Sequence, residues 1–266
     1  MIKRLLLLAL TLVCLLGCSS FQFGFNKKDD KRNEALDSTP IIELTLTKDE
    51  ISEFKKKTDP DYEKIVANNR AILTNSIFTD QKTDPCLWTN LNPKLNHLIN
   101  LKMKSKLTPQ ADAQKYINLL ISLLDESGEF RAVVVESTTE PTYFVGRYIF
   151  IGRKEVESCP DEAVLAEILS YRLFRNMEIN KRFALKQPQG ITKAKKLTAS
   201  IEAVKADWET DNDSKLTSDY AVMLIMGRAG FMPSQEGVQH SSEIKESFDG
   251  YLEFVTPLQR HKKVFD

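Results

Sequence analysis

The chain has 266 residues, with 37 Lys and Arg side chains against 37 Asp and Glu, and 42% of its residues are hydrophobic. The balance of charge excludes a polybasic nucleic-acid-binding protein and a strongly acidic solvating protein, because both depend on a large net charge. The hydrophobic fraction is high enough to build a core, so we expect most of the chain to fold.

The first 17 residues have the organisation of an export signal. Lys3 and Arg4 supply positive charge, and a largely apolar stretch of 12 residues runs from Leu5 to Leu16. A membrane-spanning helix needs about 20 residues, so this stretch suits a secretory signal better than a span. The sequence Leu15-Leu16-Gly17-Cys18 resembles the lipobox of bacterial lipoproteins, in which cleavage precedes the cysteine and its thiol is acylated. The alternative is an ordinary signal peptide with a chance cysteine near its end.

The lipobox resemblance implies a protein held on a membrane by lipid. Two or three acyl chains on Cys18 exceed what stable anchoring requires. Ser19 after the cysteine resembles proteins sorted to the outer membrane, so we expect a lipid anchor in the bacterial envelope, facing the periplasm. Residues 18–45 are polar and charged and are expected to form a flexible tether. Residues 46–266 are then a single folded domain.

Two cysteines, Cys86 and Cys159, remain once the signal is removed and Cys18 is acylated. An exported chain with two spare cysteines is expected to pair them in an oxidising compartment. The alternative is two free, buried thiols. The chain has no Cys-x-x-Cys sequence, so a thioredoxin-type redox role is not expected.

The pattern up to residue 128 predicts three helices. Thr47 with Glu50 three residues later has the form of a capping box at a helix start, and after Pro60 a second helix is expected over about 61–74. Thr108-Pro109 predicts the start of a third helix, which Ser127-Gly128 ends. Its apolar residues recur at helical spacing; they are Tyr116, Leu119, Leu120, Leu123 and Leu124.

Two runs rich in β-branched and aromatic residues predict strands over 130–136 and 143–151, either as a hairpin or as adjacent strands of one sheet. The rest of the chain is expected to be helical over about 160–178, 194–208 and 214–229, with shorter pieces beyond Pro233. The sequence therefore predicts an α+β fold, with a small sheet beside a larger helical body.

Two motifs resemble the HtpX and CAAX-prenyl-protease family of zinc metallopeptidases. Asp161-Glu162-Ala163-Val164-Leu165-Ala166 follows a strand and continues to Leu169, as in the family's helix Asp-Glu-x-x-Leu-Ala-x-x-Leu-Ala-His-Glu-x-x-His. Ser218-Asp219 leads to Ala229-Gly230-Phe231-Met232-Pro233, similar to the family's Glu-x-x-Ala-Asp helix and its Ala-Gly-aromatic-x-Pro turn. The two matches occur in the family's order and cover roughly residues 130–235. The resemblance implies a mainly helical, zincin-like fold.

This chain departs from the family at the catalytic positions. Aligning the retained leucines places Tyr171 at the first zinc histidine, Arg172 at the general-base glutamate and Arg175 at the second histidine. The third ligand, a glutamate in the family, becomes Lys215, while Asp219 is retained. Neither a guanidinium group nor an ammonium group has a lone pair to offer zinc. The sequence therefore predicts no metal site, no cofactor and no catalytic residue. We expect an Asp219–arginine pair to replace the metal as the link between the two helices.

These observations predict a non-catalytic, membrane-anchored lipoprotein with a metallopeptidase-like fold. Lipoprotein relatives of the family act in envelope assembly and quality control, so the resemblance implies a protein partner there. The expected mode of binding is addition of an extended segment to the sheet edge near 148–151. Two alternatives remain open: an active zinc metalloendopeptidase with unrecognised ligands, and a structural envelope lipoprotein with an idle cleft.

Overall fold

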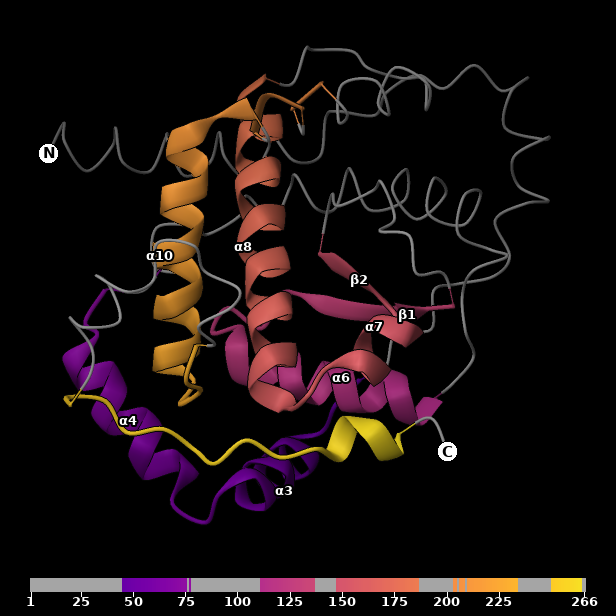
Figure 1. The fold of residues 1–266 in the computed structure, drawn as a ribbon, viewed down its shortest axis with the longest axis vertical. Helices are drawn as coiled ribbons and strands as arrows, with labels where there is room; N and C mark the ends of the chain where they lie inside the picture. The colour runs from indigo at the N-terminus through magenta and orange to yellow at the C-terminus, as the bar shows by residue number, and fades with distance from the viewer. Residues whose placement is uncertain are drawn as a thin grey trace, which may run out of the picture.

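The computed structural model describes residues 45–75, 77, 111–136, 147–186, 203–204, 206–208, 210–233 and 250–264, without the side chains of 183–186 and 212–216. Helices predominate among these residues, and they accompany a two-stranded sheet, as Figure 1 shows. The predicted α+β class is confirmed at this level. The predicted signal peptide, Cys18 and nearly all of the predicted tether lie outside the described residues.

The two helices predicted on either side of Pro60 are present. Helix α3 spans Lys48–Thr58 and helix α4 spans Tyr62–Ile72. The capping box at the start of α3 is confirmed, because Thr47 Oγ1 accepts from the Glu50 amide at 3.2 Å and Glu50 Oε2 accepts from the Thr47 amide at 2.8 Å. Both donors would otherwise lack a partner within the helix.

Helix α6 spans Ala111–Leu124 and packs against the sheet. The five apolar positions predicted for its inner face are buried; they are Tyr116, Leu119, Leu120, Leu123 and Leu124. The predicted start at Thr108-Pro109 lies outside the described residues. The helical spacing of the apolar residues therefore correctly predicts which face of α6 packs against the core.

Strand β1 spans Arg131–Val135 and strand β2 spans Tyr148–Gly152. The strands are adjacent, as one of the two predictions had it, but they run parallel, with Arg131 opposite Tyr148 and Val135 opposite Gly152. The hairpin prediction is wrong. A parallel pair needs a crossover of about a dozen residues rather than a tight turn. Residues 137–146, between the two strands in the sequence, lie outside the described part of the chain.

Helices α7, α8 and α10 follow the sheet in the described part of the chain. Helix α7 spans Arg153–Ser158 and was not predicted, α8 spans Glu162–Lys186, and α10 spans Asn212–Arg228. Helix α8 runs eight residues past its expected end at position 178, and α10 lies close to its predicted range. Most of the helix expected over 194–208 lies outside the described residues, although 203–204 and 206–208 are helical. A short 3₁₀ helix, η1, spans Arg260–Lys263.

Helices α8 and α10 stand side by side, α6 lies beside the sheet near the foot of α8, and α3 and α4 form the base (Figure 1). One continuous core joins these elements, with contributions from Ile117 of α6, Ile149 of β2, Leu169 of α8 and Ile225 of α10. None of the described helices combines the length and the apolar character needed to cross a bilayer.

Candidate functional site

The two helices that carry the family-like motifs pack against each other. Leu165, Leu169 and Leu173 on α8 share one buried cluster with Val222 and Ile225 on α10. The two helices therefore face each other, as the expected link between them requires. The five residues that align with the family's zinc site are called the degenerate site below; they are Tyr171, Arg172, Arg175, Lys215 and Asp219.

Arg175 and Tyr171 both contact Trp208, which precedes α10. The guanidinium carbon of Arg175 lies 5.4 Å from the centre of the indole ring, and Tyr171 meets the same ring edge to face at 6.2 Å between ring centroids. Arg175 is only 5% exposed and Trp208 only 3%, whereas Tyr171 is 40% exposed. A cation over an indole face is attracted by the ring quadrupole. Two positions expected at the zinc site therefore hold an aromatic and cationic stack.

Arg172 turns away from that stack toward the sheet. Its Nη1 donates to the Phe150 carbonyl oxygen at 2.7 Å and its Nη2 donates to Glu155 Oε1 at 2.6 Å. The alignment assigned Arg172 to the same site as Tyr171 and Arg175, but successive helical residues are about 100° apart, whereas residues four apart share a face. Glu155 of α7 is therefore its carboxylate partner in the structure, and sequence reasoning missed this residue because it missed α7.

Two positions of the degenerate site remain, Lys215 and Asp219. The side chain of Lys215 lies outside the described part of the chain. Asp219 is half-buried on α10 and makes contacts of its own. The Asp219–arginine pair between the two helices therefore stays a prediction.

Side chains of α8 also occupy the outer edge of β2. The carbonyl oxygens of Tyr148 and Phe150 point away from β1, and they accept from Asn176 Nδ2 at 3.1 Å and from Arg172 Nη1. An added strand would have to take these acceptors from α8. Binding of a partner at this edge, as the sequence led us to expect, therefore requires Arg172 and Asn176 to be displaced.

The retained residues of the first motif have structural partners. Asp161 Oδ1 accepts from the amides of Ala163 at 2.9 Å and Val164 at 3.1 Å, which caps the start of α8. Glu162 is buried, and its carboxylate accepts from Tyr116 Oη at 2.8 Å and from Arg260 Nε at 2.6 Å. Asp161 therefore fixes the start of α8, and Glu162 joins this start to Tyr116 and Arg260.

The second motif ends α10 with a Schellman turn. Gly230 has a φ of 78°, the Phe231 amide donates to the Met226 carbonyl at 2.9 Å, and the Gly230 amide donates to Gly227 at 3.1 Å. Glycine adopts this left-handed conformation without the cost that a Cβ imposes. The Ala-Gly-aromatic sequence is thus explained by the geometry of the helix end.

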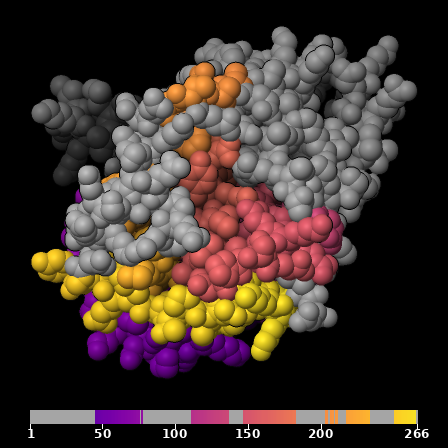
Figure 2. Space-filling model, viewed as in Figure 1, coloured from indigo at the N-terminus to yellow at the C-terminus, as the bar shows by residue number. Residues whose placement is uncertain are grey.

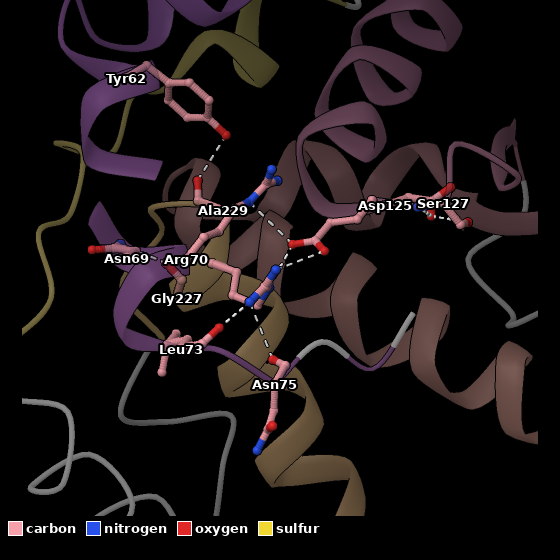
Figure 3. Close-up of polar contacts among 11 residues, drawn as sticks. Tyr62, Asn69, Arg70, Leu73, Asn75, Asp125, Ser127, Gly227 and Ala229 are labelled. Carbon is pink, nitrogen blue, oxygen red and sulfur yellow. Dashed lines mark hydrogen bonds and ion pairs between the residues drawn. The ribbon is translucent and has the colours of Figure 1, made fainter. Parts of the chain in front are cut away.

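Figure 3 shows how α4 and the end of α6 hold this turn. Tyr62 Oη donates to the Ala229 carbonyl at 2.9 Å, and Asn69 Nδ2 donates to the Gly227 carbonyl at 2.7 Å. Arg228 Nε donates to Glu126 Oε1 at 2.7 Å, and Arg228 Nη1 also donates to the Leu73 carbonyl. The end of α10 is therefore held by side chains more than 100 positions away in the chain.

No group of three or more His, Cys, Asp or Glu side chains is placed to hold a metal ion within the described ranges. His97 and His240 lie outside them, while His261 is buried and its Nε2 lies 2.7 Å from the Cys159 carbonyl oxygen. The side chains present at the degenerate site do not fit zinc, because guanidinium offers no lone pair and phenol binds well only after losing its proton.

Cys159 is buried, and its thiol donates to the Glu155 carbonyl oxygen at 3.2 Å. Burial raises the pKa of this thiol to about 11. Cys86 lies outside the described part of the chain, so the Cys86–Cys159 disulfide stays a prediction.

Comparison of the chain with protein families, with curated proteins and with solved structures finds no match in any of the three. The metallopeptidase resemblance therefore rests on the two motifs and on the packing of the helices that carry them.

Proposed function

We propose that this protein is a non-catalytic lipoprotein of the bacterial envelope, anchored through Cys18 to the outer membrane and facing the periplasm, with a zincin-like fold that binds a protein partner. The observation that carries the proposal is the engagement of Arg172 and Arg175, which stand at former catalytic positions, in contacts that build the fold.

The chemistry of these side chains argues against peptidase activity. A metallopeptidase needs electron-pair donors for its metal and a base that takes a proton from water. Arginine supplies neither, since it stays protonated in proteins. Arg172 is directed to a backbone carbonyl and to Glu155, and Arg175 lies over Trp208. Both guanidinium groups are buried, so their charges stabilise neighbouring groups rather than a substrate.

Among the side chains of the degenerate site that the structure describes, Tyr171 is the most exposed. It is 40% exposed, while its ring is held in place by Trp208. An exposed aromatic ring that is already fixed loses little side-chain entropy on binding, and tyrosine is enriched at protein interfaces. We therefore place the partner-binding surface at Tyr171 on α8.

The test combines a metal measurement with site-directed crosslinking. The purified full-length protein should contain well under 0.1 zinc per chain, and it should leave an unfolded protein substrate uncut with and without chelator. A photo-crosslinking residue at Tyr171 should capture an envelope protein in intact cells. The same residue at exposed Ile72 on α4 serves as the matched control and should capture none. Stoichiometric zinc with chelator-sensitive cleavage would indicate a peptidase instead, and equal labelling at the two positions would indicate that Tyr171 has no partner.

A further inference from the structure

The C-terminal segment 251–260, which we call the strap, lies extended across the base of the molecule. It runs from the ends of α4 and α10 to the start of α8, as the yellow ribbon in Figure 1 shows. In Figure 2 the strap lies on the surface, between α8 and the helices of the base. The surface that the strap covers is formed by elements that precede it in the chain, and we call this surface the groove.

The groove binds the backbone of the strap at three points. Asn69 acts as a neighbouring strand would, because its Nδ2 donates to the Glu253 carbonyl at 2.7 Å and its Oδ1 accepts from the Glu253 amide at 3.0 Å. The Gly230 carbonyl accepts from the Val255 amide at 2.8 Å, and the Glu162 amide donates to the Leu258 carbonyl at 2.8 Å. Backbone contacts of this kind accept an extended segment of many sequences.

Side-chain selectivity comes from a pocket that holds Arg260. The Glu162 carboxylate receives Arg260 in a two-point contact, from Nε at 2.6 Å and from Nη2 at 2.8 Å. The guanidinium carbon lies 4.2 Å from the centre of the Phe54 ring, and Nη2 also donates to Thr58 Oγ1 at 2.9 Å. A carboxylate, an aromatic face and a hydroxyl around one planar group match the chemistry of arginine more closely than that of lysine.

Few side chains of the strap are buried in this groove. Among its residues only Val255 is buried, and Tyr251, Glu253, Thr256, Pro257 and Gln259 are exposed. Arg260 keeps a buried Nη1 that donates no hydrogen bond. A segment with few buried apolar contacts opens at low cost compared with the core. We therefore expect the strap to open at a lower free-energy cost than the core.

We propose that the groove is a peptide-binding site which the strap occupies in cis, and that its ligand in trans is an extended polypeptide with an aliphatic β-branched residue five positions before an arginine. This inference goes beyond the proposed function, because Tyr171 is not among the residues that bind the strap. Val255 and Arg260 supply this pattern in the strap itself.

The probe is a fluorescent synthetic peptide with the sequence of residues 250–264, added to the full-length protein in detergent. Arg260→Ala removes the side chain that fills the pocket, so this variant should bind the peptide at least about 10-fold more tightly than the wild type does. A peptide with alanine in place of Arg260 should lose that gain. Lys262 is an exposed cation two residues from Arg260, so Lys262→Ala is the matched control. This variant should bind the peptide with the affinity of the wild type.

Equal affinity of the wild type and Arg260→Ala for the peptide, or equal binding of both peptides to the variant, would overturn the proposal. If Arg260→Ala does not fold alone, recovery of its helical circular dichroism on refolding with the peptide supports the proposal, and no recovery refutes it. Neither readout uses an envelope partner. A failure here would therefore leave crosslinking at Tyr171 intact, and loss of that crosslink would leave the peptide result intact.

Discussion

Asn118 on α6 bonds both backbone groups of Ala132 on β1. Its Nδ2 donates to the carbonyl at 3.1 Å and its Oδ1 accepts from the amide at 3.0 Å. Gln114, one turn earlier, accepts from the Val134 amide at 2.9 Å. Four helical residues rise about 6.0 Å and two strand residues about 6.6 Å, so the two side chains match alternate positions along the strand. The free edge of β1 is thereby closed by a helix.

Asn118→Ala should lower the free energy of unfolding by about 2 kcal/mol. The change leaves the buried Ala132 amide without its acceptor, and an unsatisfied buried donor costs about 1–3 kcal/mol. Chemical denaturation measures the effect. Asn68→Ala is the control, because Asn68 makes one exposed contact at 3.3 Å to Glu253, and it should change stability by less than about 0.5 kcal/mol. Equal effects of the two substitutions would contradict the role given to Asn118.

Arg172→Met should also destabilise the fold, by about 2 kcal/mol. The substitution removes the donor to the Phe150 carbonyl and leaves Glu155 without its cation, although partial exposure of Glu155 moderates the second effect. Arg153→Met removes an exposed pair with Glu157 and should cost less than about 0.5 kcal/mol. Thermal unfolding of the two variants compares them directly. If Arg172→Met left the stability of the fold unchanged, this arginine would be available for another role.

Arg175→Ala should expose Trp208 and shift its fluorescence emission to longer wavelength, with a loss of stability of about 1 kcal/mol from the cation–π contact alone. Arg175→Lys keeps a cation near the ring and should fall between the wild type and the alanine variant. The chain has one other tryptophan, Trp88. The measurement is therefore made in a Trp88→Phe background, so that only Trp208 contributes to the tryptophan emission. An unchanged spectrum would show that the guanidinium group does not cover the indole.

The elements that depend on local sequence were predictable. Residues within a few turns of one another predict the capping box of Thr47 and Glu50 and the buried face of α6. Two motifs in order along the chain predict the pairing of α8 with α10. The contact of Asn118 could also have been predicted from the sequence. A polar residue at a buried position of an apolar helix needs a hydrogen-bond partner.

The contacts that position the site depend on residues far apart in the chain. The parallel direction of β2 could not be read from its composition, and α7 is too short to show a helical period. Arg172 could then not be assigned to Glu155, which belongs to α7. The strap was missed for a related reason, since Arg260 meets Glu162 across 98 positions and neither residue has an unusual local pattern.

Cys159 should react slowly with alkylating reagents once the protein is reduced. Its pKa of about 11, against an ordinary value of 9.0, lowers the thiolate fraction at pH 8 about a hundredfold. Iodoacetamide labelling, located by mass spectrometry, measures the rate in folded and in denatured protein. The predicted disulfide with Cys86 is tested in the same experiment, because denatured but unreduced protein should then label neither cysteine. Rapid labelling of both without reductant would rule out the bridge.

Tyr116→Phe should make the protein less sensitive to alkaline pH. Burial, and then the neighbouring Glu162 carboxylate, raise the pKa of Tyr116 above its ordinary value of 10.0. The folded protein therefore keeps this proton above pH 10 while the unfolded chain loses it, so the stability of the wild type falls as the pH rises. Each pH unit above 10 costs about 1.4 kcal/mol at this site until the folded protein also ionises.

Tyr62 and Cys159 have pKa values raised by burial and add slopes of the same sign, so the measured quantity is the difference between wild type and variant. Denaturation at several pH values between 8 and 11 gives it. Below pH 10 the variant should be less stable by about 1 kcal/mol, because it lacks the hydrogen bond to Glu162, and the gap should narrow above pH 10. Tyr251→Phe, at a surface position, is the control substitution and should change the stability by less than about 0.5 kcal/mol. A gap that stays constant up to pH 11 would mean that the Tyr116 hydroxyl ionises equally in both states, which its burial against a carboxylate does not allow.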